Sequence, residues 1–203
     1  MKLYFVPGAC SVASLIAFSE AGIPVEPEPV DMMRGRLLRD GRKLSDVNER
    51  DYVPALVLDD GQLLTEGVAI MLYAGDLRPE TGLVPPPGTF ERVRMHQWLV
   101  FIATELHKGF TPLFLAKDAG EKYVELATKK ARTRLGTLAK QVGDGPFLFG
   151  EQFTVADGYV FYVLRCWTRM FKQELSGPLV SYYDRIAARP RVKAALEMEG
   201  YGT

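Results

Sequence analysis

Cysteine is scarce in this chain of 203 residues, which contains only Cys10 and Cys166. The two cysteines lie far apart and form neither a CxxC motif nor a metal-ligand spacing, so the sequence predicts no disulfide framework and no metal site. An excess of charge is lacking as well, because 25 lysines and arginines balance 25 aspartates and glutamates. We therefore expect no nucleic-acid partner and no attraction to an anionic membrane surface.

Long apolar runs are also missing. No stretch approaches the roughly 20 residues that cross a bilayer, and the sequence opens on a strand-like segment in place of a signal peptide. These features predict a cytoplasmic protein that does not enter a membrane. The apolar residues nevertheless make up 47% of the chain, which is enough to bury a substantial core.

The first 77 residues change their hydrophobic period repeatedly, which is typical of mixed α/β structure. We expect a strand at Lys2–Val6 and a helix at Ser11–Ala21. Ile23–Val30 is extended in character, but its three prolines would confine a strand there to a sheet edge. Apolar runs on both sides of Asp59-Asp60-Gly61 indicate a hairpin, and a helix follows it. This order of elements is that of a thioredoxin-like unit.

Residues 78–89 contain four prolines and two glycines, a composition that suits a linker between domains. The remainder, residues 90–203, has almost wholly helical periodicity. One long helix is expected from Phe90 to Leu106, and Pro112 would end or bend the helical path. Thr154-Val-Ala-Asp157 has the pattern of a capping box at the start of an apolar helix, so we interpret Asp157 as structural and not catalytic.

Cys10 lies where the first strand turns into the first helix. Unpaired amides and the helix dipole at such a turn favour a thiolate, and they also suit a bound thiol or anion. The alternative is that Cys10 is only a small buried apolar residue, as lone cysteines usually are. Its position favours the functional interpretation.

Two further groups in the first 77 residues could bind a ligand. Val53-Pro54 precedes a strand, and its backbone could pair with an extended, peptide-like ligand; the sequence leaves the isomer of this bond open. At the start of the next helix, the amide of Gly67 could hold a carboxylate and Glu66 could accept hydrogen bonds from an amino group. An ordinary helix start is the alternative for these two residues.

The two histidines of the chain both fall on the predicted long helix. His107 lies one turn beyond Thr104 and just past Glu105, which would turn it towards the domain cleft. His96 precedes it by eleven residues, or about three turns, so both rings can lie on one face. Spacing alone does not choose between them, and a lone histidine is more often a structural hydrogen-bonding group.

Four strings of residues together resemble bacterial beta-class glutathione S-transferases. These strings are Pro7-Gly8-Ala9-Cys10-Ser11, Val53-Pro54-Ala55-Leu56, Leu64-Thr65-Glu66-Gly67-Val68-Ala69-Ile70 and Thr104-Glu105-Leu106-His107-Lys108-Gly109-Phe110. The resemblance spans essentially the whole chain. It implies a thioredoxin-like α/β N-terminal domain (1–77), a linker (78–89) and an all-helical C-terminal domain (90–203).

The resemblance also implies a function. The protein would be a homodimeric glutathione transferase with reduced glutathione as cosubstrate and a small hydrophobic electrophile as second substrate. Cys10 and His107 would be the catalytic residues, with Cys10 beside the glutathione sulfur and able to form a mixed disulfide. Val53 would pair with the cysteinyl backbone and Glu66 with Gly67 would hold the γ-glutamyl end. Thr104, Glu105 and His107 would contribute from the helical domain.

The chain departs from the family pattern at four places, one of which is Cys166-Trp167, where a single tryptophan is usual. Gly35 stands where a lysine is frequent, Val100 where an asparagine is frequent, and Asn48-Glu49-Arg50-Asp51 where an Asn-Pro-x-Gly string is common. A non-catalytic relative that binds hydrophobic ligands or a protein is therefore the alternative. The joint presence of Cys10, Glu66 and His107 favours the enzyme, because a binding scaffold does not need all three.

Overall fold

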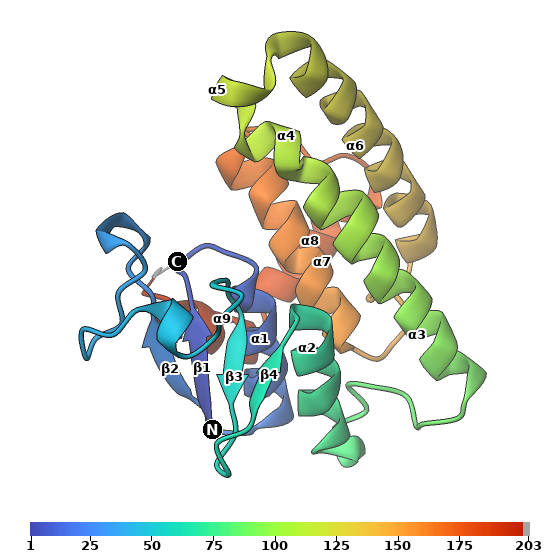
Figure 1. The fold of residues 1–203 in the computed structure, drawn as a ribbon. Helices are drawn as coiled ribbons and strands as arrows, with labels where there is room; N and C mark the ends of the chain where they lie inside the picture. Colours follow the sequence, from blue (N-terminus) through green and yellow to red (C-terminus); the bar gives the residue numbers. More distant parts are fainter. Residues whose placement is uncertain (201–203) are drawn as a thin grey trace. The chain divides into compact units, whose positions relative to one another are not determined.

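The computed structural model describes residues 1–200, which form two compact units (Figure 1). The first unit consists of Met1–Val84 together with residues 187–200, and the second is Pro85–Ile186. The sequence placed everything after residue 89 in the helical domain, whereas by its contacts the last helix belongs with the first unit. No helix within residues 1–200 is both long and apolar enough to cross a membrane.

The first unit contains a four-stranded sheet in the order β2-β1-β3-β4. Strand β1 pairs parallel with β2 and antiparallel with β3, and β3 pairs antiparallel with β4. The strands are β1 (Lys2–Phe5), β2 (Glu26–Pro29), β3 (Ala55–Val57) and β4 (Leu63–Thr65). The predicted hairpin and the predicted thioredoxin-like order of elements are both confirmed.

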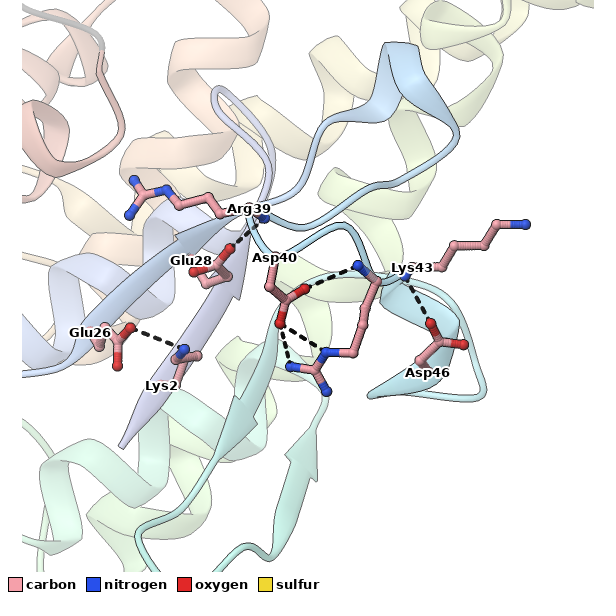
Figure 2. Close-up of polar contacts among 8 residues, drawn as sticks. Lys2, Glu26, Glu28, Arg39, Asp40, Lys43 and Asp46 are labelled. Carbon is pink, nitrogen blue, oxygen red and sulfur yellow. Dashed lines mark hydrogen bonds and ion pairs between the residues drawn. The ribbon is translucent and has the colours of Figure 1, made fainter.

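Strand β2 lies at a sheet edge, as its prolines required. Polar contacts join this edge strand to β1 and to the segment that follows it (Figure 2). The buried carboxylate of Glu28 accepts the Arg39 amide at 2.9 Å, and Lys2 pairs with Glu26 at 3.0 Å. Charged side chains along an edge also discourage pairing with another chain.

Helices α1 (Ser11–Ala21), α2 (Gly67–Asp76) and α9 (Pro190–Met198) complete the first unit, and α1 packs against the other two. Gly22 ends α1 in the left-handed conformation, with φ of 66°. Arg189 forms a two-pronged ion pair with the buried Glu20 side chain, at 2.6 and 2.7 Å. These long-range contacts explain why the last helix joins the first unit.

Gly75 is required by the close approach of α2 to Val84. A Cβ atom at position 75 would lie 2.2 Å from Val84 Cγ2, far inside contact distance, and the valine side chain is buried and stiff. We expect Gly75→Ala to lower the free energy of unfolding by about 1 kcal/mol, because overpacking costs about 1–3 kcal/mol and the gain in helix propensity offsets about 1 kcal/mol of that cost.

Chemical denaturation of four proteins tests this expectation. In the background of Val84→Ala, which removes Cγ2 but keeps the Cβ at 3.0 Å, Gly75→Ala should cost clearly less than in the native chain. Additive effects of the two substitutions would show that Val84 is not the reason for the glycine.

The second unit is helical throughout. Its longer helices are α3 (Phe90–Phe101), α6 (Glu121–Val142), α7 (Val155–Arg165) and α8 (Pro178–Ala187), with short α4 (Thr111–Phe114) and α5 (Ala116–Ala119) between α3 and α6. The long helix expected to Leu106 is wrong in its last five residues, because α3 gives way to a π-helical turn at Ile102–His107 and a 3₁₀ turn at Lys108–Phe110. A π turn shifts the hydrogen-bond register, and hydrophobic spacing carries no signal for it.

Asp157 anchors the core of the second unit. Its fully buried carboxylate accepts the Thr154 amide and hydroxyl, each at 2.8 Å, as part of the predicted capping box. It also accepts the Leu148 amide at 2.7 Å and the Tyr182 hydroxyl at 2.6 Å. Burial raises the pKa of Asp157, because desolvation of the charged form outweighs these four donors. The structural interpretation of this aspartate is thus supported by its contacts.

Candidate functional site

The turn before α1 positions Cys10 at the end of strand β1. The buried Ser11 hydroxyl ties this turn to β1, since it accepts the Val6 amide and donates to the Val6 carbonyl, both at 3.2 Å. The Gly8 amide donates to the carboxylate of Glu199 at 3.1 Å. Glu199 was missed by sequence reasoning, because a contact across 191 residues leaves no local signal.

Cys10 and Val53 lie together in the first unit. The Cys10 thiol is half-buried and lies 3.6 Å from the Val53 carbonyl oxygen, within hydrogen-bonding range for sulfur. The Val53-Pro54 bond, whose isomer the sequence left open, is cis. Gly67 faces Pro54, because a Cβ at this glycine would lie 3.5 Å from the proline ring. The start of α2 is therefore adjacent to the Val53-Pro54 pair.

Glu66 precedes α2 with a backbone φ of 70°, an uncommon value for a residue other than glycine. Its carboxylate is exposed and accepts a hydrogen bond from the Tyr52 hydroxyl. The guanidinium of Arg50 lies 3.8 Å from the same carboxylate oxygen. The Gly67 amide is in the first turn of α2, where amides have no partner within the helix. Four of the predicted site residues, Cys10, Val53, Glu66 and Gly67, thus belong to one unit.

The structure separates the roles of the two arginines that flank Gly35. The Arg36 guanidinium binds both the carboxylate and the carbonyl oxygen of Asp51. Arg34 instead lines a pocket of about 670 Å³, and its guanidinium makes no ion pair within residues 1–200. Pro7, from the turn that leads to Cys10, lines the same pocket. A positive charge therefore remains near position 35 although the lysine is absent.

The other three predicted residues lie on the π-helical turn of the second unit. The Thr104 hydroxyl donates to the Val100 carbonyl at 2.9 Å. The Glu105 carboxylate accepts from Arg134 at 2.7 Å and pairs with Lys130 at 3.3 Å, and these two contacts lower its pKa. Two basic side chains of α6, Lys130 and Arg134, are thus paired with Glu105, and sequence reasoning did not predict either contact.

His107 is half-buried between two tyrosines of α7. Its Nδ1 lies 2.8 Å from the Tyr159 hydroxyl and its Nε2 lies 3.4 Å from the Tyr162 hydroxyl. His96 is exposed and meets Arg92 instead, at 3.1 Å, so the two histidines do not share an environment. Burial, with a smaller contribution from Lys108, lowers the pKa of His107 to about 4. The imidazole is therefore neutral at pH 7.

This shift links stability to pH. An unfolded histidine titrates near pH 6.5, so between about pH 6.5 and 4 the unfolded chain binds a proton that folded His107 does not bind. His107 thus lowers stability as the pH falls. Between pH 7 and pH 4.5, the free energy of unfolding should therefore fall by roughly 2 kcal/mol less in His107→Gln than in the native protein.

Urea denaturation at both pH values measures this difference. His96→Gln, which replaces the exposed ring, is the matched control and should keep the native pH dependence. Equal losses in the native protein and in His107→Gln would show that His107 is not the group responsible.

No cluster of histidine, cysteine, aspartate or glutamate side chains suited to a metal ion occurs within the described part of the chain. Both cysteines are thiols, with Cys10 half-buried and Cys166 buried. The groups of the first unit that can bind or react with a ligand are therefore the Cys10 thiol, the Val53 backbone, the Glu66 carboxylate and the Gly67 amide at the start of α2.

Known proteins are similar to this chain in sequence. The sequence model of the glutathione S-transferase N-terminal domain matches residues 9–77, and that of the C-terminal domain matches residues 104–199. The glutathione S-transferase GstA of Escherichia coli O157:H7 is 43% identical over 202 residues, covering 98% of this chain and 99% of that protein.

Solved structures agree with the sequence matches. A sphingomonad glutathione S-transferase complexed with glutathione is 37% identical with a TM-score of 0.91, and the match covers 100% of both chains. The bacterial beta-class glutathione S-transferase of Sphingomonas chungbukensis is 40% identical with a TM-score of 0.90, covering 98% of this chain and 99% of that one.

Proposed function

This chain belongs to the glutathione S-transferase family, and from that premise we propose that it conjugates reduced glutathione to small hydrophobic electrophiles. The resemblance to the bacterial beta-class enzymes is confirmed, and so is the two-part fold that it implied. Similarity to named transferases along the full chain favours the enzyme over a non-catalytic scaffold. The observation that carries the proposal is the Cys10 thiol, 3.6 Å from the Val53 carbonyl and on the same unit as the Glu66-Gly67 helix start.

We place glutathione along these groups of the first unit. Glu66 accepts hydrogen bonds from the α-amino group of the γ-glutamyl end, and the Gly67 amide donates to its carboxylate. The backbone at Val53 pairs with the cysteinyl part, as an added strand would. The glutathione sulfur then lies beside Cys10. Arg34 is the candidate for the glycyl carboxylate, since Arg36 is already bound to Asp51.

The resemblance to the beta-class enzymes implies that residues of the second unit also contribute to glutathione binding. Thr104 and Glu105 would add polar contacts to the ligand, and His107 would act near the thiol. Because His107 is neutral, it cannot supply a positive charge to the thiolate. Its Nδ1 and Nε2 already face the hydroxyls of Tyr159 and Tyr162, so a hydrogen bond from the neutral ring to the sulfur anion would replace one of these two contacts.

The proposed reaction is an attack by the glutathione thiolate on an electrophilic carbon. With an aryl halide, a carbon–sulfur bond forms, the halide leaves with its bonding electrons, and the thiol proton passes to solvent. The main catalytic need is stabilisation of the thiolate before the attack. Cys10 offers a second reaction, thiol–disulfide exchange with glutathione.

We extend the proposal to a cytoplasmic homodimer. An exposed apolar stripe on α3, formed by Phe90, Val93 and Val100, supports self-association because these side chains are 57% to 69% exposed in the single chain. A cytoplasmic location fits a protein whose reactive thiol must stay reduced. Sedimentation equilibrium at the mass of one chain would refute the dimer.

Calorimetric titration with reduced glutathione, together with turnover of an aryl halide, tests the function. We expect a dissociation constant in the micromolar to millimolar range, and turnover that depends on glutathione. S-methylglutathione is the matched control, because it should bind without supporting turnover. Binding without turnover of any electrophile would favour a scaffold, and the absence of binding would refute the proposal.

A further inference from the structure

The loop at residues 48–52 departs from the family pattern, and a single buried side chain fixes it. Asn48 is 1% exposed. Its Nδ2 donates to the Tyr52 carbonyl at 2.8 Å, and its Oδ1 accepts the Arg50 amide at 3.2 Å. The buried Asn48 side chain therefore fixes the loop backbone by these two hydrogen bonds, while the side chains of Arg50 and Tyr52 remain exposed. A loop built in this way presents those two side chains in a defined place.

The Arg50 guanidinium lies beside the carboxylate of Glu66. Its Nη1 is 3.3 Å from the Tyr52 hydroxyl, 3.3 Å from the Thr65 hydroxyl and 3.8 Å from Glu66 Oε1. The Tyr52 hydroxyl donates to the same Glu66 oxygen and so bridges the two charged groups. A positive and a negative charge thus stand side by side at the start of α2.

This pair matches the chemistry of an α-amino acid. Such a group carries an ammonium and a carboxylate on one carbon atom, and so needs one negative and one positive partner close together. A guanidinium has five N–H donors, and within residues 1–200 the Arg50 guanidinium donates hydrogen bonds through Nη1 alone. The remaining donors suit the two oxygens of a carboxylate.

We propose that Arg50 is a specificity-determining residue that binds the α-carboxylate of the γ-glutamyl end of glutathione, while Glu66 binds the neighbouring ammonium group. The Gly67 amide shares the same carboxylate. This inference rests on the proposed glutathione binding, and it adds a charged contact from the loop that replaces the Asn-Pro-x-Gly string. The site should therefore select glutathione with a free α-amino group and a free α-carboxylate over analogues in which either group is modified.

The test compares three ligands and three proteins by calorimetry and steady-state kinetics. The ligands are reduced glutathione, an analogue whose γ-glutamyl α-carboxylate is an amide, and an analogue whose α-amino group is acetylated. The proteins are the native chain, Arg50→Gln and Arg42→Gln. Arg42 is the matched control, because it is an exposed arginine of the same unit that pairs with Asp40 at 2.8 Å.

We expect Arg50→Gln to weaken glutathione binding and to raise KM by about tenfold, with kcat changed less than about twofold. The same loss should appear with the acetylated analogue. With the amide analogue, Arg50→Gln and the native chain should bind equally, because the group that Arg50 recognises is gone. Arg42→Gln should behave as the native chain with all three ligands.

Three results would overturn the role of Arg50. They are native affinity in Arg50→Gln, tighter binding in that variant, or an equal loss with the amide analogue. Each leaves the binding of glutathione by the native chain intact, so the proposed function would survive. Failure of the native chain to bind glutathione would instead refute the proposed function and the role of Arg50 together. Arg50 is exposed, so its replacement does not threaten folding.

Discussion

Replacing Cys10 with alanine should abolish the glutathione adduct that forms when the protein is incubated with glutathione disulfide. In the native chain, the Cys10 thiolate attacks one sulfur of the disulfide, the S–S bond breaks, and one glutathione leaves as a thiolate. The product is a mixed disulfide on Cys10, and the exchange needs no external oxidant. Intact-mass spectrometry measures the adduct directly.

Cys10→Ala should lose the adduct completely, because only the Cys10 thiol is accessible enough to react with glutathione disulfide. Cys10 is half-buried at a helix start, whereas Cys166 is 2% exposed. Cys166→Ala is therefore the matched control and should keep the adduct. The fold of Cys10→Ala should stay cooperative, since the hydrogen bond that the thiol donates to Val53 is long and weak. An adduct that persists in Cys10→Ala, or that appears on Cys166, would remove Cys10 from the proposed site.

The largest loss of stability should come from Asp157→Ala. The substitution leaves the Leu148 amide, the Thr154 amide and hydroxyl, and the Tyr182 hydroxyl without their buried acceptor. Each stranded donor costs about 1–3 kcal/mol, although partial rearrangement limits the sum, and we expect a loss of about 4 kcal/mol in the free energy of unfolding. Urea denaturation followed by circular dichroism measures it.

Two variants test whether the stability loss comes from the hydrogen bonds of Asp157 and not from the removal of any carboxylate. Asp144→Ala removes an exposed carboxylate from the same unit and should change stability by less than about 0.5 kcal/mol. Tyr182→Phe removes only the hydroxyl that donates to Asp157 and leaves the other three donors paired, so it should lower the free energy of unfolding by about 1 kcal/mol. A loss below about 1 kcal/mol in Asp157→Ala would mean that the four donors find other partners.

Local patterns predicted much of the fold because the responsible forces act over short distances. The Asp-Gly hairpin and the capping box at Thr154 both involve residues within a few positions of each other. The same holds for the thiol of Cys10, whose place at a strand-to-helix turn follows from the breaks around it. Where a few neighbouring residues determine the backbone, the sequence is sufficient.

Contacts between distant residues were beyond the same reasoning. The pairing of Glu105 with Arg134 crosses 29 positions, and no pattern at either residue indicates it. The π turn that carries His107 changes the register by which side-chain directions are inferred, so helical spacing could not show that this histidine lies between two tyrosines. The Arg50–Glu66 pair was also missed, because a loop and a helix start meet there only through tertiary structure.

The return of α9 to the first unit has a consequence for synthesis on the ribosome. The strands and α1 of that unit are made early, but α9, which packs on α1, is made only after the whole helical unit. One face of α1 therefore stays uncovered while roughly 100 further residues are added, or for about 5 to 20 seconds at ordinary rates of translation. The first unit begins to fold first and is finished last, and in that interval its uncovered apolar face is open to a chaperone.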